Sequence, residues 1–184
     1  MGSEKTVLDE EELGNTVQLL YDAFALVESV GGSLSPYVPT QDYVASVLTQ
    51  LAAAFAERRP RGGRPALYYE PGCGAGKVAS GAAARGLYSI CLELDEYLAR
   101  EAQERARRSP LLDVVVGDLS VFRPRRVDVV YAYLLPRAVR RVLEALEGLH
   151  APVVSLDYPA EGDRGVLSAA RLDVLGRSVF VYES

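Results

Sequence analysis

From residue 66 onward, the sequence alternates between short apolar runs and longer segments whose apolar residues recur at helical spacing. Short apolar runs bounded by turn signals predict buried strands, and apolar residues at every third or fourth position predict amphipathic helices. Strands that alternate with helices pack as a mostly parallel sheet covered on both faces. We therefore predict strands over 66–70, 87–94, 111–116, 127–133 and 152–157, and helices that end near 84 and span 95–107 and 136–149.

The first part of the chain does not follow this alternation. Apolar residues at helical spacing predict an N-terminal helical extension over residues 1–36. Thr40 follows a short proline-containing turn, and we expect it to cap a helix that continues to about Glu57.

The last part of the chain predicts antiparallel pairing. Two runs, 166–174 and 178–182, flank Gly176 and indicate a hairpin. The predicted fold class is therefore α/β: a doubly wound, mostly parallel Rossmann-like sheet with a C-terminal antiparallel hairpin and an N-terminal helical extension. Residues 37–184 are expected to form one domain.

Composition narrows the class of protein. The 184 residues are 49% hydrophobic and 24% charged, which is the balance of a soluble globular domain. No apolar run approaches the roughly 20 residues that cross a bilayer, and the acidic, polar first residues do not resemble a secretory signal. We therefore expect a cytoplasmic protein without a membrane partner. The net charge of −5 argues against coating nucleic acid by charge alone, so nucleic acid is not an expected partner.

Scarce residue types exclude several kinds of chemistry. The single histidine, His150, argues against a Ser-His-Asp triad or a multi-histidine site, so no metal is expected. Cys73 and Cys91 are too few for a disulfide framework, and we interpret them as a small loop residue and a buried strand residue. Lys5 and Lys77 are the only lysines, and arginine supplies the other positive charges. Few thermolabile residues fit a thermophilic source but the lysine shortage does not, so thermophily stays open.

A glycine-rich loop follows the first strand of the alternating region. It contains Gly72, Gly74 and Gly76 in a G-x-G-x-G spacing, with Glu70 two residues before the first glycine. The dinucleotide fingerprint G-x-G-x-x-G would need a glycine where Lys77 stands, and the P-loop pattern is also absent. A carboxylate at this position would repel a pyrophosphate but suits an ammonium group. The loop therefore points away from NAD and ATP.

Two further acids follow the next two strands. Glu93 closes the second strand, where a carboxylate typically accepts hydrogen bonds from ribose hydroxyls. Asp118 closes the third strand, where it could accept a hydrogen bond from an adenine amino group or simply cap a turn. An ammonium, a ribose and an adenine are all present in S-adenosylmethionine, whose sulfonium an acidic pocket would tolerate. S-adenosylmethionine is therefore the predicted cofactor.

With these motifs, residues 66–157 resemble the class I S-adenosylmethionine-dependent methyltransferases. More narrowly, Tyr-Val-Pro-Thr at 37–40 and Asp-Val-Val-Tyr-Ala-Tyr-Leu-Leu-Pro at 128–136 resemble the small archaeal and mitochondrial protein lysine methyltransferases, a likeness that extends over 37–183. The resemblance implies methyl transfer to lysine ε-amines of proteins, with S-adenosylhomocysteine as the product. The cofactor-binding residues that follow from the motifs and the resemblance are Thr40, Glu70, Gly72, Gly74, Gly76, Glu93, Leu94, Asp118 and Leu119.

The mouth of the fourth strand supplies the candidate catalytic residues. Tyr131 and Tyr133 point the same way along this strand, and Tyr133 lies at its end. The segment 133–136 lacks the N/D-P-P-Y motif that grips a planar nitrogen, whereas an aromatic, partly apolar mouth suits an amine on an alkyl chain. We therefore expect Tyr133, and with it Tyr131, to orient a lysine amine, and Asp157 to hold the incoming ammonium. Exposed lysines of proteins are the expected substrate.

Other interpretations of these patterns stay open. Both tyrosines could be packing residues. A methyltransferase could act on RNA or on a small molecule, with arginine clusters or the N-terminal helix forming the acceptor site. The fold could also serve a binding module that holds the cofactor or a partner and transfers nothing.

Overall fold

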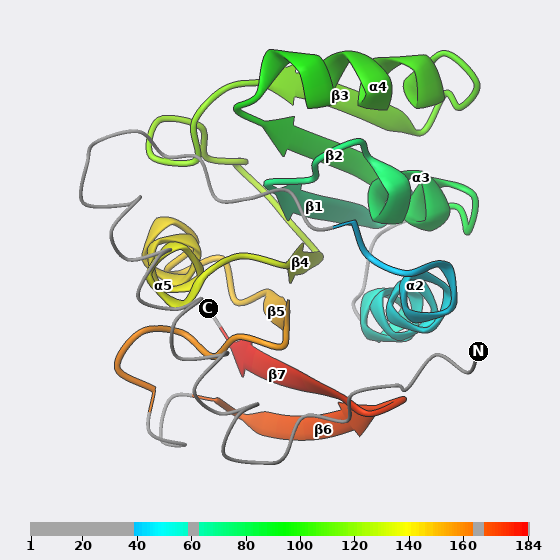
Figure 1. Ribbon diagram of the computed structural model, residues 1–184. Coiled ribbons are helices and arrows are strands. Elements are labelled where there is room, and N and C mark those ends of the chain that lie inside the picture. Colours follow the sequence, from blue (N-terminus) through cyan, green and yellow to red (C-terminus); the bar gives the residue numbers. More distant parts are fainter. Residues whose placement is uncertain (1–38, 59–62, 164–167, 184) are drawn as a thin grey trace, which may run out of the picture. The chain divides into compact units, whose positions relative to one another are not determined.

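The computed structural model describes residues 39–58, 63–163 and 168–183, all within one compact unit of the chain (Figure 1). The predicted N-terminal extension over 1–36 lies outside the described residues. The helices are α2 (Asp42–Glu57), α3 (Lys77–Ala83), α4 (Glu96–Ala106) and α5 (Pro136–Ala145), and the strands are β1 (Leu67–Pro71), β2 (Tyr88–Glu93), β3 (Leu112–Val116), β4 (Val129–Ala132), β5 (Pro152–Leu156), β6 (Ala170–Val174) and β7 (Arg177–Glu183).

The strands form one seven-stranded sheet in the order β3-β2-β1-β4-β5-β7-β6. β1 to β5 are parallel, and β7 is antiparallel to both β5 and β6. The chain runs outward from β1 to β3 and then returns to β4 on the other side of β1. The strand order therefore reverses between β1 and β4, and ligands of open α/β sheets bind at the carboxyl ends of the strands at such a reversal. The predicted fold class is confirmed.

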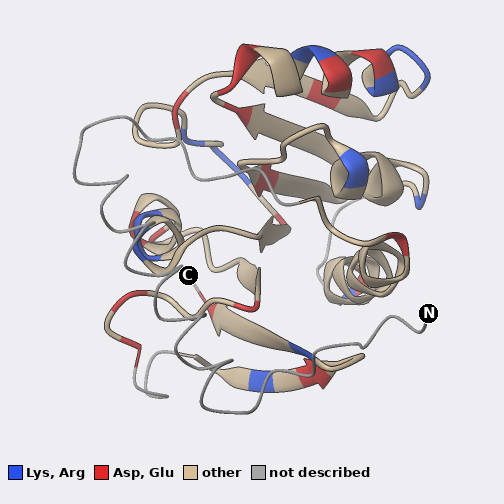
Figure 2. Cartoon of the chain, viewed as in Figure 1, with Lys and Arg blue, Asp and Glu red and all other residues tan. Residues whose placement is uncertain are grey.

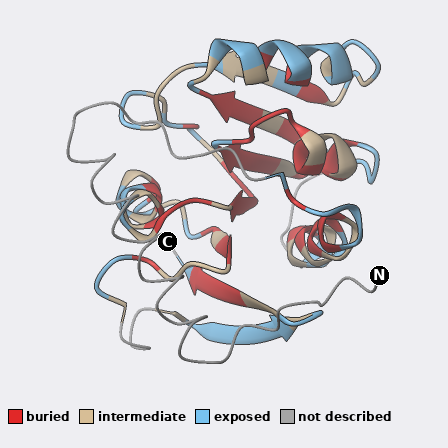
Figure 3. Cartoon of the chain, in the orientation of Figure 1, coloured by how far each residue is buried: buried red, intermediate tan, exposed pale blue. Residues whose placement is uncertain are grey.

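The two faces of the sheet carry separate hydrophobic cores. Strand–helix–strand connections are right-handed. A helix that connects strands added on one side of β1 therefore lies on the opposite face from a helix that connects strands added on the other side. Buried residues of α2, α3 and α4 pack on one face with side chains such as Tyr68 and Tyr131. Val139 and Val142 of α5 pack on the other face with Tyr69. Figure 3 shows the buried central strands and the exposed edge strand β6.

Two predicted boundaries are wrong at the start of helices and strands. Gln41, not Thr40, is the N-cap of α2, because the Gln41 carbonyl accepts the bond from Ala45 N at 2.9 Å. The fourth strand begins two residues later than predicted. The Asp128 amide donates to Leu67 O at 2.8 Å, but the Leu67 amide donates to the Asp128 carboxylate at 2.8 Å. A side chain thus takes the place of a backbone acceptor at this position.

The last predicted helix is also shorter than its apolar pattern. It ends at Ala145, where the amide of Leu146 is shared between the carbonyls of Val142 and Leu143. Gly148 follows with a φ of 80°, a left-handed conformation that suits glycine and ends helices. Within the described residues, no helix is both long and apolar enough to cross a membrane.

Candidate active site

The glycine loop connects β1 to α3 at the carboxyl end of the sheet. The amides of Gly72 and Cys73 donate to Leu92 O at 2.8 and 3.1 Å, which ties the loop to β2. Gly72 has a φ of 68°, and a Cβ there would lie 2.6 Å from a methyl carbon of Leu134. Gly76 has a φ of 72°, and a Cβ there would lie 2.9 Å from Ala102 of α4. These glycines therefore permit both left-handed backbone and close packing.

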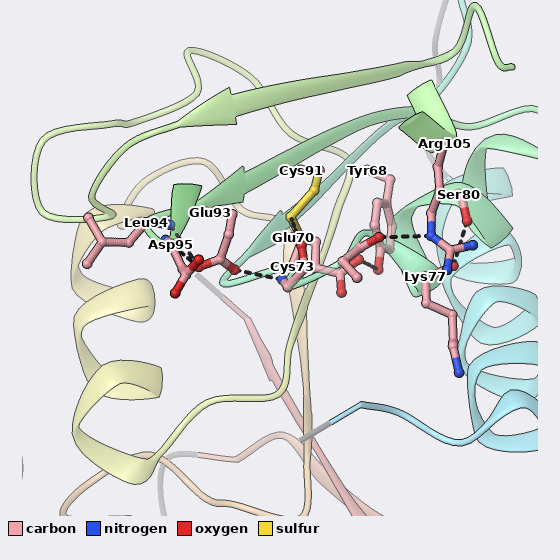
Figure 4. The surroundings of a disulfide bond; sticks show 12 residues. Tyr68, Glu70, Cys73, Lys77, Ser80, Cys91, Glu93, Leu94, Asp95 and Arg105 are labelled. Atoms are coloured by element: carbon pink, nitrogen blue, oxygen red, sulfur yellow. Dashed lines mark hydrogen bonds between the residues drawn. A yellow bond between two sulfur atoms is a disulfide. The ribbon is translucent and has the colours of Figure 1, made fainter. Parts of the chain in front are cut away.

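Glu93 ties the loop to the end of β2 through its side chain (Figure 4). One oxygen accepts the amide of Gly74 at 2.7 Å, and the other accepts the amides of Leu94 and Asp95 at 2.9 Å each. The side chain is buried. A carboxylate offers about four acceptor positions, so capacity remains for a further donor such as a hydroxyl group. Glu93 and the loop therefore form one unit, and the ribose-binding role stays a prediction.

Cys73 and Cys91 form a disulfide that joins the same two segments (Figure 4). The expected positions of the two cysteines are confirmed, since Cys73 lies in the loop and Cys91 is buried in β2, but the bond between them was not predicted. Sequence spacing alone did not reveal the bond, because the pairing depends on how the loop after β1 folds back onto β2. Cys73 lies between Gly72 and Gly74, so the bond fixes the position of the loop against the sheet.

Glu70 lies buried at the end of β1, beneath the loop. Its carboxyl accepts a hydrogen bond from the hydroxyl of Tyr68 at 3.0 Å. Desolvation raises the pKa of Glu70 to about 8, the hydrogen bonds from Tyr68 and from the backbone of Ala79 oppose this, and the nearby Glu93 adds to it. A buried carboxyl with little compensation is chemically suited to pair with a cationic group.

The other predicted cofactor residues lie at the same edge of the sheet. Asp118 follows β3 and accepts the amide of Ser120 at 2.8 Å, so it does cap a turn. Leu94 is 45% exposed beside Glu93. Leu119 lines a small apolar pocket with Tyr69. The amide of Gly117 donates to Glu93 O at 2.9 Å, which aligns the ends of β2 and β3.

Thr40 reaches the site from the segment before α2. Its hydroxyl lies 3.4 Å from the hydroxyl of Tyr131, and its carbonyl accepts a bond from Lys77 Nζ at 3.1 Å. Lys77 also forms an ion pair with Asp42 at 3.0 Å. The lysine that breaks the dinucleotide fingerprint thus fastens the start of α2 to the start of α3. Tyr131 is buried, and desolvation followed by the charge of Glu70 raises its pKa.

The remaining predicted catalytic residues lie beyond the carboxyl ends of β4 and β5. Tyr133 follows β4 and is partly buried, and its ring stacks with that of Tyr158 at a centroid distance of 6.0 Å. Asp157 follows β5 and pairs with Arg177, the first residue of β7. Arg177 also donates to the Tyr133 hydroxyl at 3.1 Å. Sequence reasoning missed Arg177, since only the antiparallel pairing of β7 with β5 brings it here.

The two groups of residues therefore flank the strand-order reversal. Around β1 and β2 lie Thr40, Glu70, the glycine loop and Glu93. Around β4 and β5 lie Tyr133, Asp157 and Arg177. A buried acid, left-handed glycines and acids at the ends of three successive strands fit the ammonium, ribose and adenine of S-adenosylmethionine. Within the described part of the chain, no group of three or more His, Cys, Asp or Glu residues is arranged to hold a metal ion.

Comparison with known proteins also indicates a methyltransferase fold. A family model described as "Methyltransferase domain" matches residues 69–153. The RNA methyltransferase of Salinibacter ruber, solved with S-adenosyl-L-homocysteine, aligns with a TM-score of 0.65 and 25% identity over 79% of this chain and 93% of that chain. A putative RNA methyltransferase of Pyrococcus horikoshii aligns with a TM-score of 0.59 and 20% identity over 88% and 96%. No curated protein matches the sequence.

A third solved structure, a variant of MtNAS in complex with S-adenosylmethionine, aligns with a TM-score of 0.58 and 18% identity over 77% of this chain and 62% of that chain. The fold is that of the class I S-adenosylmethionine-dependent methyltransferases. The prediction of S-adenosylmethionine as the cofactor is confirmed. The narrower likeness to lysine methyltransferases is not confirmed, and neither is the expectation that nucleic acid is not a partner.

Proposed function

We propose that this protein transfers a methyl group from S-adenosylmethionine to RNA. When bound, the cofactor supplies an electrophilic methyl group on a positively charged sulfur. In this proposal, Glu70 faces the ammonium, Glu93 accepts from the ribose and Asp118 from the adenine. Tyr133 then orients the acceptor at the mouth, opposite the cofactor loop. Methyl transfer of this kind depends chiefly on alignment of the reacting atoms.

The pairing of Asp157 with Arg177 is the observation that carries the choice of RNA. Both Asp157 oxygens accept hydrogen bonds from Arg177. An ammonium that approached Asp157 would have to displace a guanidinium from this pair. The mouth instead offers two stacked tyrosine rings and an arginine, which suit planar groups and single-stranded nucleic acid.

Two further observations support the same acceptor. The RNA methyltransferase of Salinibacter and the putative RNA methyltransferase of Pyrococcus align over nearly their whole length. Exposed arginines also lie near the mouth despite the negative net charge. Arg137 is in the first turn of α5, four residues after Tyr133, and Arg141 is one turn further on. Figure 2 shows positively charged positions of α5 in blue. Local positive charge can bind phosphates that the net charge alone would repel.

Protein lysine is the second candidate acceptor. The observation that favours it is the segment Tyr133-Leu134-Leu135-Pro136, in place of the N/D-P-P-Y motif, together with the resemblance to lysine methyltransferases. A lysine ε-amine titrates near about 10.4 and must lose its proton before it attacks. Asp157 would serve this acceptor only if its pair with Arg177 opened.

Methyl-labelled S-adenosylmethionine tests the proposal. The purified protein would be incubated separately with total RNA and total protein from its source, with Tyr133→Ala as the acceptor-site control. We expect label that ribonuclease releases, and at least tenfold less label with the variant. Label recovered as methyllysine in the protein fraction would replace RNA with the second candidate. Absence of label in both fractions would overturn both.

A further inference from the structure

The C-terminal hairpin contributes a side chain to the mouth of the parallel sheet. β7 is antiparallel to β5, with Leu156 opposite Val179, so the first residues of β7 lie beside the residues that follow β5. The amide of Asp157 donates to Ser178 O at 2.7 Å, which fixes this register. Arg177 is therefore carried to the edge of the sheet where Tyr133 follows β4.

Arg177 is held by several hydrogen bonds at once. Its Nε donates to both oxygens of Asp157, at 2.9 and 3.0 Å, and its Nη2 donates to Asp157 Oδ2 as well. The same Nη2 donates to the Tyr133 hydroxyl at 3.1 Å. The guanidinium carbon also lies 5.7 Å from the Tyr133 ring centroid. Only the planar fork of an arginine can make this set of contacts.

These contacts determine what the Tyr133 hydroxyl can do. Its oxygen accepts a bond from Arg177, and among the described residues no hydrogen bond is recorded that uses its own proton. A partly buried hydroxyl in this state is disposed to donate. It therefore favours an acceptor molecule with a carbonyl or ring nitrogen over a protonated amine, which could only donate.

The backbone at Asp157 is unusual for a structural ion pair. Asp157 has a φ of 61°, a left-handed conformation that is uncommon for residues other than glycine. Such conformations cost energy and concentrate at functional sites. The cost is borne here by the residue that fixes Arg177.

We propose that Arg177 is a positioning residue of the acceptor site, which clamps Tyr133 so that its ring, stacked on Tyr158, and its hydroxyl bind a nucleobase. This inference rests on the proposed function and names the part of RNA that the site binds. Arg177 acts through Tyr133 and Asp157 and takes no direct part in methyl transfer. The hairpin thereby becomes part of the acceptor site and not only an edge of the sheet.

The test measures RNA binding separately from turnover. Fluorescein-labelled fragments of total RNA would be titrated with the protein in the presence of S-adenosylhomocysteine, which removes any dependence on catalysis. Arg177→Ala, Arg177→Lys and Tyr133→Phe would be compared with Arg171→Ala. Arg171 lies on β6 of the same hairpin and stacks over Phe180. Its removal takes away the same charge without removing a contact to Asp157 or Tyr133.

We expect Arg177→Ala to bind RNA at least tenfold more weakly, and Arg171→Ala to change affinity by less than about twofold. Arg177→Lys keeps the charge but not the fork, so it should restore less than half of the lost affinity. The double variant Arg177→Ala/Tyr133→Phe should lose little more RNA affinity than Tyr133→Phe alone, because the arginine acts through the Tyr133 hydroxyl. Cofactor affinity should be unchanged in each variant.

Two outcomes separate the possible failures. If the wild-type protein binds RNA and Arg177→Ala binds equally well, or if Arg177→Lys restores full affinity, the positioning role is overturned while the proposed function stands. If the wild-type protein neither binds nor methylates RNA, the proposed function falls and this inference falls with it.

Discussion

Among the described residues, Glu70 is the acid whose environment departs most from that of a carboxyl group in water. It is buried at the end of β1, and the hydroxyl of Tyr68 is its side-chain hydrogen-bond partner. Desolvation raises its pKa from 4.5 to about 8. Burial therefore favours the protonated form of this carboxyl in the ligand-free protein, and a cationic ligand group would favour its ionisation.

This shift predicts a pH dependence of stability. A carboxyl whose folded-state pKa lies above its unfolded value binds more protons when folded, so its contribution to stability is complete below about pH 4.5 and is lost as pH rises through about 8. Relative to Glu70→Gln, the wild-type protein should lose up to about 1.4 kcal/mol of unfolding free energy per pH unit within this window. Chemical unfolding at several pH values measures the difference. Parallel pH profiles for the two proteins would contradict the assignment.

At the scale of elements, the glycine loop is bound to β2 by three kinds of contact. Backbone amides bond to Leu92 O, Glu93 accepts the amide of Gly74, and the Cys73–Cys91 disulfide joins the segments covalently. The loop is thus positioned before any ligand binds, and preorganisation of this kind reduces the entropic cost of binding.

The disulfide predicts a response to reduction. It closes a segment with a sequence separation of 18 residues, for which chain entropy predicts about 3 kcal/mol of stabilisation. Reduction should therefore lower the melting temperature by about 10 °C. The variant with both Cys73→Ser and Cys91→Ser should melt near the reduced protein and ignore the reductant. If the wild-type melting temperature stays unchanged after mass spectrometry shows two free thiols, the contribution of the bond is refuted.

The pattern of apolar runs was sufficient to predict the described strands and helices, and the parallel sheet follows from their alternation. It could not place features that depend on contacts between distant segments. Thr40 has the chemistry of a helix cap, yet Gln41 is the cap and Thr40 instead contacts Tyr131 and Lys77. Asp157 looked free to bind an ammonium because Arg177 is twenty positions away in the sequence.

On the scale of the whole sheet, the residues proposed to bind the cofactor and those proposed to bind the acceptor lie on opposite sides of the strand-order reversal. The loop after β1, the acid at the end of β2 and the acid after β3 lie on one side of the strand-order reversal, and Tyr133, Asp157 and Arg177 lie on the other. A methyl donor and an acceptor bound at these two places would meet at the reversal. The acids of the proposed cofactor site were predictable because each lies at or just beyond the end of a predicted strand, whereas the hairpin's contribution requires the order β5-β7-β6.

Calorimetric titration with S-adenosylmethionine tests the central claim most directly. The wild-type protein should bind one equivalent, and Glu93→Ala should bind roughly 5- to 150-fold more weakly, which corresponds to the loss of about 1–3 kcal/mol of hydrogen bonding. Glu96→Ala is the matched control, because Glu96 is an exposed acid in the first turn of α4 with a long contact to Arg100. Its affinity should equal that of the wild-type protein. No binding by the wild-type protein, or equal binding by Glu93→Ala, would contradict the account.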